Sequence, residues 1–124
     1  MKEKTAVLVF DAEKRTFKHT TISTLDDIYE NLNCRCFDIA TRKIGDTYYD
    51  IYCDDEGLLK ENPIVSAINH NGEVMLVGNL LFAKHNKRGG TVGLKEKEMD
   101  EIIENTVKVV LYTGDKLDMV MCEY

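Results

Sequence analysis

The chain has 124 residues, with 44% hydrophobic residues, 31% charged residues and a formal net charge of −6, as is typical of one folded domain. The acidic balance argues against a general nucleic-acid-binding protein, because such proteins neutralise phosphates with lysine and arginine. No apolar run approaches the roughly 20 residues of a membrane-spanning helix, and no signal-peptide pattern is present. We therefore expect a single domain over residues 1–124, located in the cytoplasm with reduced cysteines.

Two strand-like runs open the chain and predict a hairpin. Residues 5–10 are almost continuously apolar, and residues 16–23 are rich in β-branched side chains that suit a half-exposed edge strand. Residues 24–33 then predict an amphipathic helix that lies across a sheet. Thr24 is the expected N-cap of this helix, and Asn33 is its expected C-terminal stop.

A tyrosine-rich strand is the segment around which the rest of the fold is expected to be arranged. Residues 34–44 alternate in polarity, Gly45 and Asp46 suit a tight turn, and residues 48–54 alternate again before an acidic turn that ends at Gly57. We expect 48–54 to be central or nearly central in a sheet.

The next segments contain one ambiguous region. Residues 62–68 fit a short helix opened by Asn62 and Pro63, or a strand, because seven residues are too few for periodicity to separate the two. Residues 73–83 predict one buried strand, in which Gly78 marks a bulge or the close approach of another backbone.

The last third of the chain predicts a second amphipathic helix over 94–106, with Met99, Ile102 and Ile103 on its apolar side. Residues 107–112 and 117–122 then predict a closing hairpin. The whole pattern indicates the α+β class, with a mostly antiparallel sheet, two amphipathic helices and a C-terminal hairpin.

Four features in a fixed order resemble a known family. They are Leu25-Asp-Asp-Ile-Tyr29, Asp54-Asp-Glu-Gly57 followed by Leu-Leu-Lys60 and Asn62-Pro63, Val77-Gly-Asn79, and Leu94 at the entry to a polar helix. The order is similar to that of the small phage and bacterial mobile-element proteins grouped as domain of unknown function 3846. The resemblance covers roughly residues 5–105, with the hairpin 107–122 as an addition. It implies an accessory role and supplies no catalytic residue.

A basic, glycine-ended loop over residues 84–90 is the best candidate for binding an anion. Flexible glycines can present backbone N–H groups beside three cationic side chains, although a merely solvated charge run gives the same pattern. A tyrosine that is expected to be exposed could stack on a ring of the ligand. The candidate ligand-binding residues are Lys84, His85, Lys87, Arg88, Gly89, Gly90 and Tyr52.

Two other clusters are interpreted as structural. The acidic residues Asp50, Asp54, Asp55 and Glu56 lack the ligand spacing of a calcium loop, which favours a solvated turn. Cys34, Cys36 and Cys53 could form a zinc site with His19 or His70, but a Cys-x-Cys within a strand fits a zinc knuckle poorly. The three cysteines are therefore interpreted as small buried side chains, and Cys122 is interpreted as structural. No metal, cofactor or catalytic residue is predicted.

The leading hypothesis is a non-enzymatic accessory protein of a phage or mobile element that binds a host protein or a small anionic ligand. One alternative is an acidic DNA mimic that inhibits a host nucleic-acid enzyme. Another is a nucleotide binder that uses the 84–90 loop. Unpaired backbone along 16–23 and in the closing hairpin makes a homodimer possible.

Overall fold

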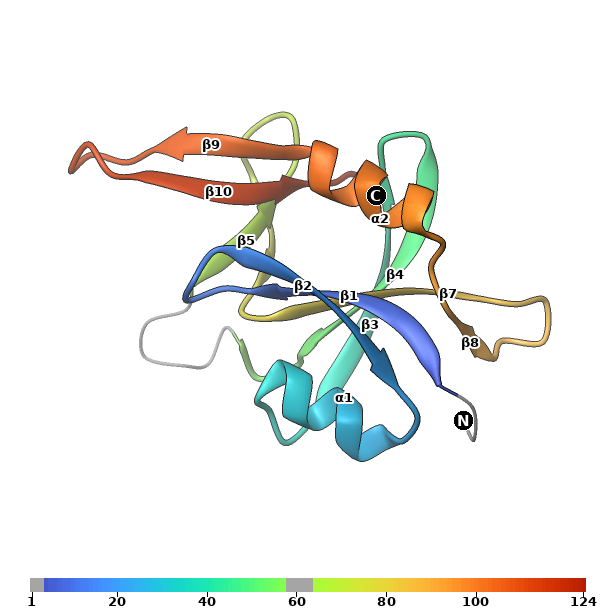
Figure 1. The fold of residues 1–124 in the computed structure, drawn as a ribbon. Coiled ribbons are helices and arrows are strands. Elements are labelled where there is room, and N and C mark those ends of the chain that lie inside the picture. The colour runs from blue at the N-terminus through green and yellow to red at the C-terminus, as the bar shows by residue number, and fades with distance from the viewer. Residues whose placement is uncertain (1–3, 58–63) are drawn as a thin grey trace.

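The computed structural model describes residues 4–57 and 64–124, which form ten strands and two α-helices (Figure 1). The elements are β1 Thr5–Asp11, β2 Thr16–Ile22, α1 Leu25–Leu32, β3 Phe37–Ile44, β4 Thr47–Asp54, β5 Val65–Ile68, β6 Val74–Val77, β7 Leu80–His85, β8 Thr91–Val92, α2 Glu96–Glu104, β9 Thr106–Val110 and β10 Lys116–Met121. The first sheet has the order β2-β1-β7-β4-β3, with β8 also paired to β7, and the second has the order β6-β5-β10-β9. Most pairs are antiparallel, which confirms the α+β prediction; β5 and β10 pair in parallel.

The first sheet is covered on both faces. The helix α1 lies on one face, over a cluster that includes Val9 and Tyr52. The helix α2 and the second sheet lie on the other face, over a larger cluster that includes Tyr49, Ile102 and Val120. Strand β4 runs between β7 and β3, so its successive side chains enter different cores, and the expectation of an interior strand is confirmed.

Local sequence signals explain the helix and the turn that precede β4. The Thr24 hydroxyl accepts a hydrogen bond from the Asp27 N–H at 3.3 Å, while the Asp27 carboxylate accepts one from the Thr24 N–H at 3.1 Å. Asn33 adopts the left-handed conformation with φ 52° and ends α1. Gly45, with φ 63°, turns the chain from β3 into β4, as predicted.

The segment 73–83 is two strands, and the prediction of one buried strand was wrong. Strand β6 belongs to the second sheet and β7 to the first. The apolar run is continuous because the end of β6 and most of β7 are buried in the two sheets. Gly78, at φ 76°, lies between them, and its N–H donates to the Ile64 carbonyl at 2.8 Å. The glycine therefore marks the transfer of the chain from one sheet to the other.

The choice left open for residues 62–68 is decided, and the predicted bounds of two other elements were wrong. Asn62 and Pro63 lie outside the described residues, but 65–68 is strand β5, between β6 and β10, which confirms the strand alternative there. Strand β3 begins at Phe37, because the Cys34 N–H instead donates to the Tyr29 carbonyl at the end of α1. Leu94 and Thr106 lie outside α2: the Leu94 N–H donates to the Ala6 carbonyl of β1, and Thr106 begins β9.

The closing hairpin is present as predicted and contributes to the core. Strand β10 lies between β5 and β9, and the side chains of Val120 and Cys122 are buried within the larger cluster. Beyond β10, Glu123 forms backbone hydrogen bonds in both directions with Lys43 of β3. The hairpin therefore completes the second sheet and joins it to the first.

Replacing Val120 by alanine should lower the free energy of unfolding by about 1–3 kcal/mol, because it removes buried methyl groups and leaves a cavity. Val74→Ala is the matched control, since Val120 is 0% exposed and Val74 is 55% exposed. The control should change stability by less than about 0.5 kcal/mol in urea unfolding. Equal effects of the two substitutions would contradict a core role for β10.

A part-buried polar contact anchors α2 to strand β4, close to the turn that leads into it from β3. The Tyr49 hydroxyl donates to Glu101 Oε1 at 2.6 Å. This hydrogen bond lowers the pKa of Glu101, while burial together with Glu101 raises the pKa of Tyr49. A Cβ atom at Gly45 would stand 3.0 Å from the Glu101 side chain, so a glycine fits where the carboxylate approaches the turn.

Glu101→Gln should destabilise the protein most near neutral pH. The folded-state pKa of Glu101 is lowered, so its stabilising contribution is present above the unfolded pKa of about 4.3 and is lost as the pH falls through the folded value. The difference in unfolding free energy between the variant and the original chain should therefore shrink below about pH 4. Glu104→Gln, at an exposed position of the same helix, serves as the control in urea titrations at several pH values.

Candidate functional site

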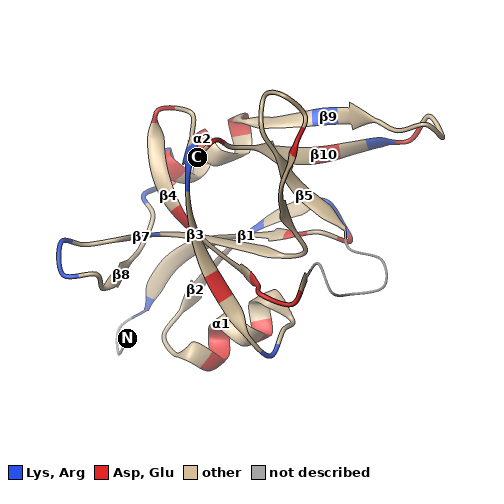
Figure 2. Ribbon diagram, turned by 180° about the vertical axis from the view of Figure 1, so that it is seen from behind, with Lys and Arg blue, Asp and Glu red and all other residues tan. Residues whose placement is uncertain are grey.

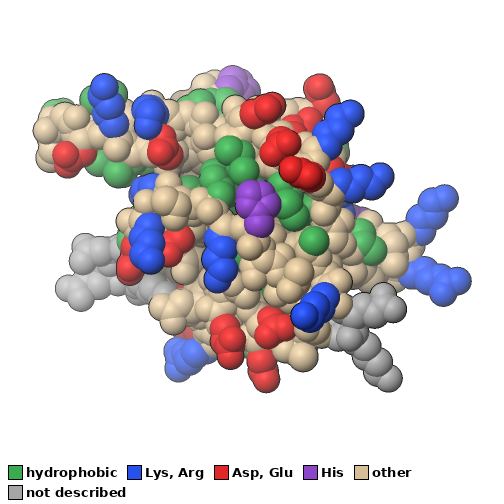
Figure 3. All heavy atoms as spheres, viewed as in Figure 1, with side chains coloured by type: hydrophobic (Ala, Val, Ile, Leu, Met, Phe, Trp, Pro, Cys, Tyr) green, Lys and Arg blue, Asp and Glu red, His purple; other side chains and the backbone are tan. Residues whose placement is uncertain are grey.

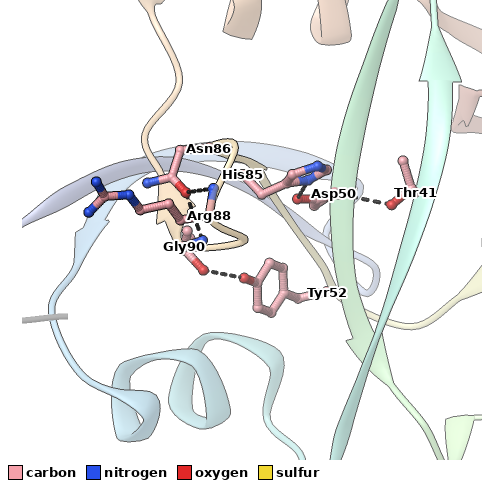
Figure 4. Close-up of polar contacts among 8 residues, drawn as sticks. Thr41, Asp50, Tyr52, His85, Asn86, Arg88 and Gly90 are labelled. Carbon is pink, nitrogen blue, oxygen red and sulfur yellow. Dashed lines mark hydrogen bonds and ion pairs between the residues drawn. The ribbon is translucent and has the colours of Figure 1, made fainter.

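The predicted anion-binding loop is the turn of the β7–β8 hairpin, and its shape is fixed by Asn86 (Figure 4). The Asn86 side-chain oxygen accepts hydrogen bonds from the N–H groups of Arg88 and Gly90, each at 2.9 Å. The Asn86 N–H donates to the Gly90 carbonyl, and the Gly89 N–H donates to the Asn86 carbonyl. Gly89 supplies the required left-handed conformation at φ 82°. Most N–H groups of the loop therefore donate hydrogen bonds within the loop itself. A ligand would be bound mainly by the side chains.

The basic side chains of the loop lie in two different places. Lys87 and Arg88 are exposed at the end of the hairpin, which projects from the body of the molecule (Figure 2). Lys84 instead faces α2, where its ammonium lies 2.8 Å from Glu98 Oε2. Burial of Glu98 opposes its ionisation, but the hydrogen bonds from Lys84 and from the Lys95 N–H prevail and lower the pKa of Glu98. Lys84 therefore joins the hairpin to α2.

A buried carboxylate holds the imidazole of His85 beside the hairpin turn. Asp50 Oδ2 lies 2.7 Å from His85 Nδ1, and Asp50 Oδ1 accepts a hydrogen bond from the Thr41 hydroxyl at 2.9 Å. Asp50 is 6% exposed, whereas the His85 side chain is largely exposed. Because Nδ1 is engaged by Asp50, Nε2 is the ring nitrogen left for a ligand.

Tyr52 lies beneath the hairpin, and the expectation that it is exposed was wrong. Its side chain is 4% exposed, its ring centroid lies 5.4 Å from that of Phe37, and its hydroxyl lies 2.7 Å from Thr91 Oγ1 of β8. Tyr52 is buried because α1 and Phe37 cover this face of the sheet. Tyr52 therefore supports β8 from below, whereas Tyr48 is exposed as expected.

The acidic turn and the cysteines lie apart from the hairpin. Glu56 forms an ion pair with Arg35 at 3.3 Å, and Asp54 accepts a hydrogen bond from the Glu56 N–H. Within residues 4–57 and 64–124, no three His, Cys, Asp or Glu side chains are grouped as a metal site.

The cysteines differ in exposure. Cys36 is exposed, which contradicts the prediction that it is buried, because it precedes β3 instead of lying within a strand. Cys34 and Cys53, also predicted to be buried, are half-buried. Cys122 is buried in the larger core cluster, and burial raises the pKa of both Cys53 and Cys122 to about 11.

Sequence reasoning identified the basic loop 84–90 but predicted neither strand β8 nor the contact between Asp50 and His85. Asp50 was grouped with the acidic turn, although it lies in the middle of β4, where it pairs in register with Ala83. The alternation of 48–54 was a usable signal, because it places Asp50 on the same side of the strand as Tyr52.

Two mostly antiparallel sheets with two helices define a small protein of the α+β class. The model of the family described as Domain of unknown function (DUF3846) matches residues 1–107, and the chain belongs to this family. No curated protein and no solved structure matches the chain. Neither α1 nor α2, the two α-helices of the described residues, is long and apolar enough to cross a membrane.

Asp50→Ala should lower the free energy of unfolding by about 1–3 kcal/mol, because it removes two hydrogen-bonding contacts, with the Thr41 hydroxyl and the His85 ring, each of which contributes about 0.5–1.5 kcal/mol. Asp55→Ala, at an exposed position just beyond the same strand, should change it by less than about 0.5 kcal/mol. Thermal and urea unfolding of both variants provide the measurement. A neutral Asp50→Ala would show that the contact with His85 is not formed in solution.

Proposed function

We propose that the protein is a non-enzymatic accessory binding module of a phage or bacterial mobile element, and that it acts in the host cytoplasm. Its β7–β8 hairpin recognises an acidic surface on a host protein. The observation that carries the proposal is an imidazole oriented by the buried Asp50 beside two exposed cations, Lys87 and Arg88, on a turn of fixed shape. The mobile-element setting rests on the resemblance to the DUF3846 proteins.

A preformed turn lowers the cost of binding. The hydrogen bonds of Asn86 hold the loop in one shape, and the Tyr52–Thr91 contact braces β8, so little backbone freedom is lost when a partner docks. Arg88 supplies a planar guanidinium that can bind a carboxylate in bidentate fashion. Lys87 adds a mobile point charge beside it. The three side chains are thus suited to carboxylate groups on a partner.

The placement of the cations favours a protein partner over a small ligand. Small molecules bind in concave sites that bury most of their surface. The hairpin end instead projects from the body, whereas cavities of about 440 and 230 Å³ lie between the β1–β2 turn and α1, lined in part by Asp11, Glu30 and Asn79. Single exposed ion pairs contribute only about 0–1 kcal/mol, so useful affinity requires a broader contact than one anion provides.

The DNA-mimic alternative needs carboxylates arranged along one face in the manner of phosphates. On the face shown in Figure 3, basic side chains are interspersed with acidic ones, and nothing in this arrangement favours the alternative over a binding module. The nucleotide-binding alternative uses the same hairpin and is separated from the proposal by the experiment below.

Charge reversal in Lys87→Glu/Arg88→Glu should abolish co-purification of the partner from native host cells, because it replaces attraction by repulsion. Lys14→Glu/Lys97→Glu changes the net charge equally at exposed sites elsewhere and should retain the partner. Quantitative mass spectrometry should show one protein enriched by the original chain and by the control, lost with the hairpin variant, and released by high salt. A partner that the hairpin variant retains would refute the proposal.

The small-ligand alternative is measured in parallel. Inorganic phosphate and a nucleotide panel at millimolar concentration should leave the melting temperature unchanged if the partner is a protein. A rise that depends on Lys87 and Arg88 would overturn the protein-partner proposal in favour of a small anion, since a bound ligand stabilises the native state.

A further inference from the structure

An exposed tyrosine lies on the same face of β4 as the carboxylate that holds His85. Tyr48, Asp50 and Tyr52 are alternate residues of this strand, so their side chains point to one side of the sheet. Tyr52 belongs to the cluster that α1 covers and is 4% exposed, whereas Tyr48 is 55% exposed. The cover therefore ends between the two tyrosines. An aromatic ring is left in solvent about 7 Å along the strand from Asp50.

This ring adjoins the recognition surface of the β7–β8 hairpin. Asp50 lies two residues from Tyr48 and contacts His85 Nδ1 at 2.7 Å, on the side of the sheet from which the hairpin turn continues (Figure 4). The His85 side chain is 57% exposed. Lys87 and Arg88 follow it, and within residues 4–57 and 64–124 no acidic side chain forms an ion pair with either cation. Tyr48 therefore adds an apolar group to a surface whose hairpin end is cationic.

The charge of this extended surface differs between its two ends. At the tyrosine end, Lys43 is the cross-strand neighbour of Tyr48, and Asp46 is exposed in the adjoining turn, so the two charges offset each other. At the hairpin end, Lys87 and Arg88 leave a net positive charge. A ligand that is apolar at one end and acidic at the other is complementary to this arrangement.

We propose that Tyr48 is the apolar anchor of the recognition surface, and that the host protein contributes one segment in which an aromatic side chain adjoins carboxylates. This inference rests on the proposed function, because it specifies what the β7–β8 hairpin recognises. Exposed ion pairs contribute little, so the cations alone give weak binding. Tyrosine offers a large contact area with few torsion angles to fix, and it is enriched, like arginine, among the residues that dominate binding energy. A pair of aromatic rings adds attraction beyond the burial of their area.

The open sheet face favours a protein segment over a nucleotide, although both combine rings with anionic groups. Small molecules bind in concave sites, and neither Tyr48 nor His85 lines the cavities of about 440, 230 and 200 Å³. The exposed Tyr112 belongs instead to the end of the β9–β10 hairpin, which projects away from the β7–β8 hairpin (Figures 1 and 2). Tyr112 therefore serves as a control site for the loss of an exposed tyrosine.

Two synthetic peptides that differ at one position test the inference. Acetyl-Glu-Asp-Phe-Asp-Glu-amide carries a ring between carboxylates, and the second peptide has serine in place of the phenylalanine. Backbone amide shifts of the isotope-labelled protein are followed by NMR during titration to millimolar concentration. Both peptides should shift the amides of residues 85–90. The phenylalanine peptide should also shift those of residues 47–49 and bind at least about threefold more tightly.

Three variants separate this inference from the proposed function. Tyr48→Thr keeps a strand-forming residue and should reduce binding of the phenylalanine peptide to the level of the serine peptide, whereas Tyr112→Thr should leave both affinities unchanged. Lys87→Glu/Arg88→Glu should abolish binding of both peptides. Equal affinities of the two peptides for the unaltered chain, or a phenylalanine advantage that survives Tyr48→Thr, would overturn the inference and leave the proposed function standing.

The remaining outcomes concern the hairpin and the class of ligand. Failure of both peptides to bind, or binding that Lys87→Glu/Arg88→Glu leaves intact, would overturn the proposed function together with the inference. Adenosine monophosphate, which joins a ring system to a phosphate, should bind more weakly than the phenylalanine peptide. Tighter binding of adenosine monophosphate at residues 47–49 and 85–90 would overturn the inference in favour of a nucleotide.

Discussion

Burial of the first sheet on both faces is the constraint from which the other features follow. The helix α1 covers one face, while α2 and the second sheet cover the other, so β4 and β7 have little contact with solvent. Alternate side chains of β4 therefore enter two separate cores. In such a strand, a polar side chain must find a hydrogen-bond partner within the protein, because an unpaired buried carboxylate is costly.

Asp50 meets this requirement by contacts with both neighbouring strands. It accepts a hydrogen bond from Thr41 of β3 and contacts the ring of His85 at the end of β7. The result is a histidine fixed in orientation at the place where the hairpin leaves the sheet. The side-chain hydrogen bonds of Asn86 and the Tyr52–Thr91 contact complete the support. The proposed recognition surface is thus a consequence of how strand β4 satisfies its buried acidic residue, Asp50.

Elements could be predicted from the sequence where neighbouring residues determine them. The cap formed by Thr24 and Asp27 identified α1, and Gly45 identified the turn into β4. Features that depend on distant pairing were not predictable. The contact of Asp50 with His85 requires the register of β4 with β7. The segment 65–68 becomes a strand because β6 and β10 flank it. Gly78 was singled out by the sequence, but the continuous apolar run around it concealed that the strands on its two sides belong to different sheets.

The parallel pairing of β5 with β10 has a consequence for synthesis on the ribosome. All strands of the first sheet have been synthesised once residue 92 is added. The parallel partner of β5, strand β10, is synthesised only with residues 116–121. Until then, a nascent chain exposes the side of the first sheet that Val120 later covers. Translation must therefore pass β10 before the domain can close, and slow elongation across 93–115 would prolong exposure of an aggregation-prone intermediate.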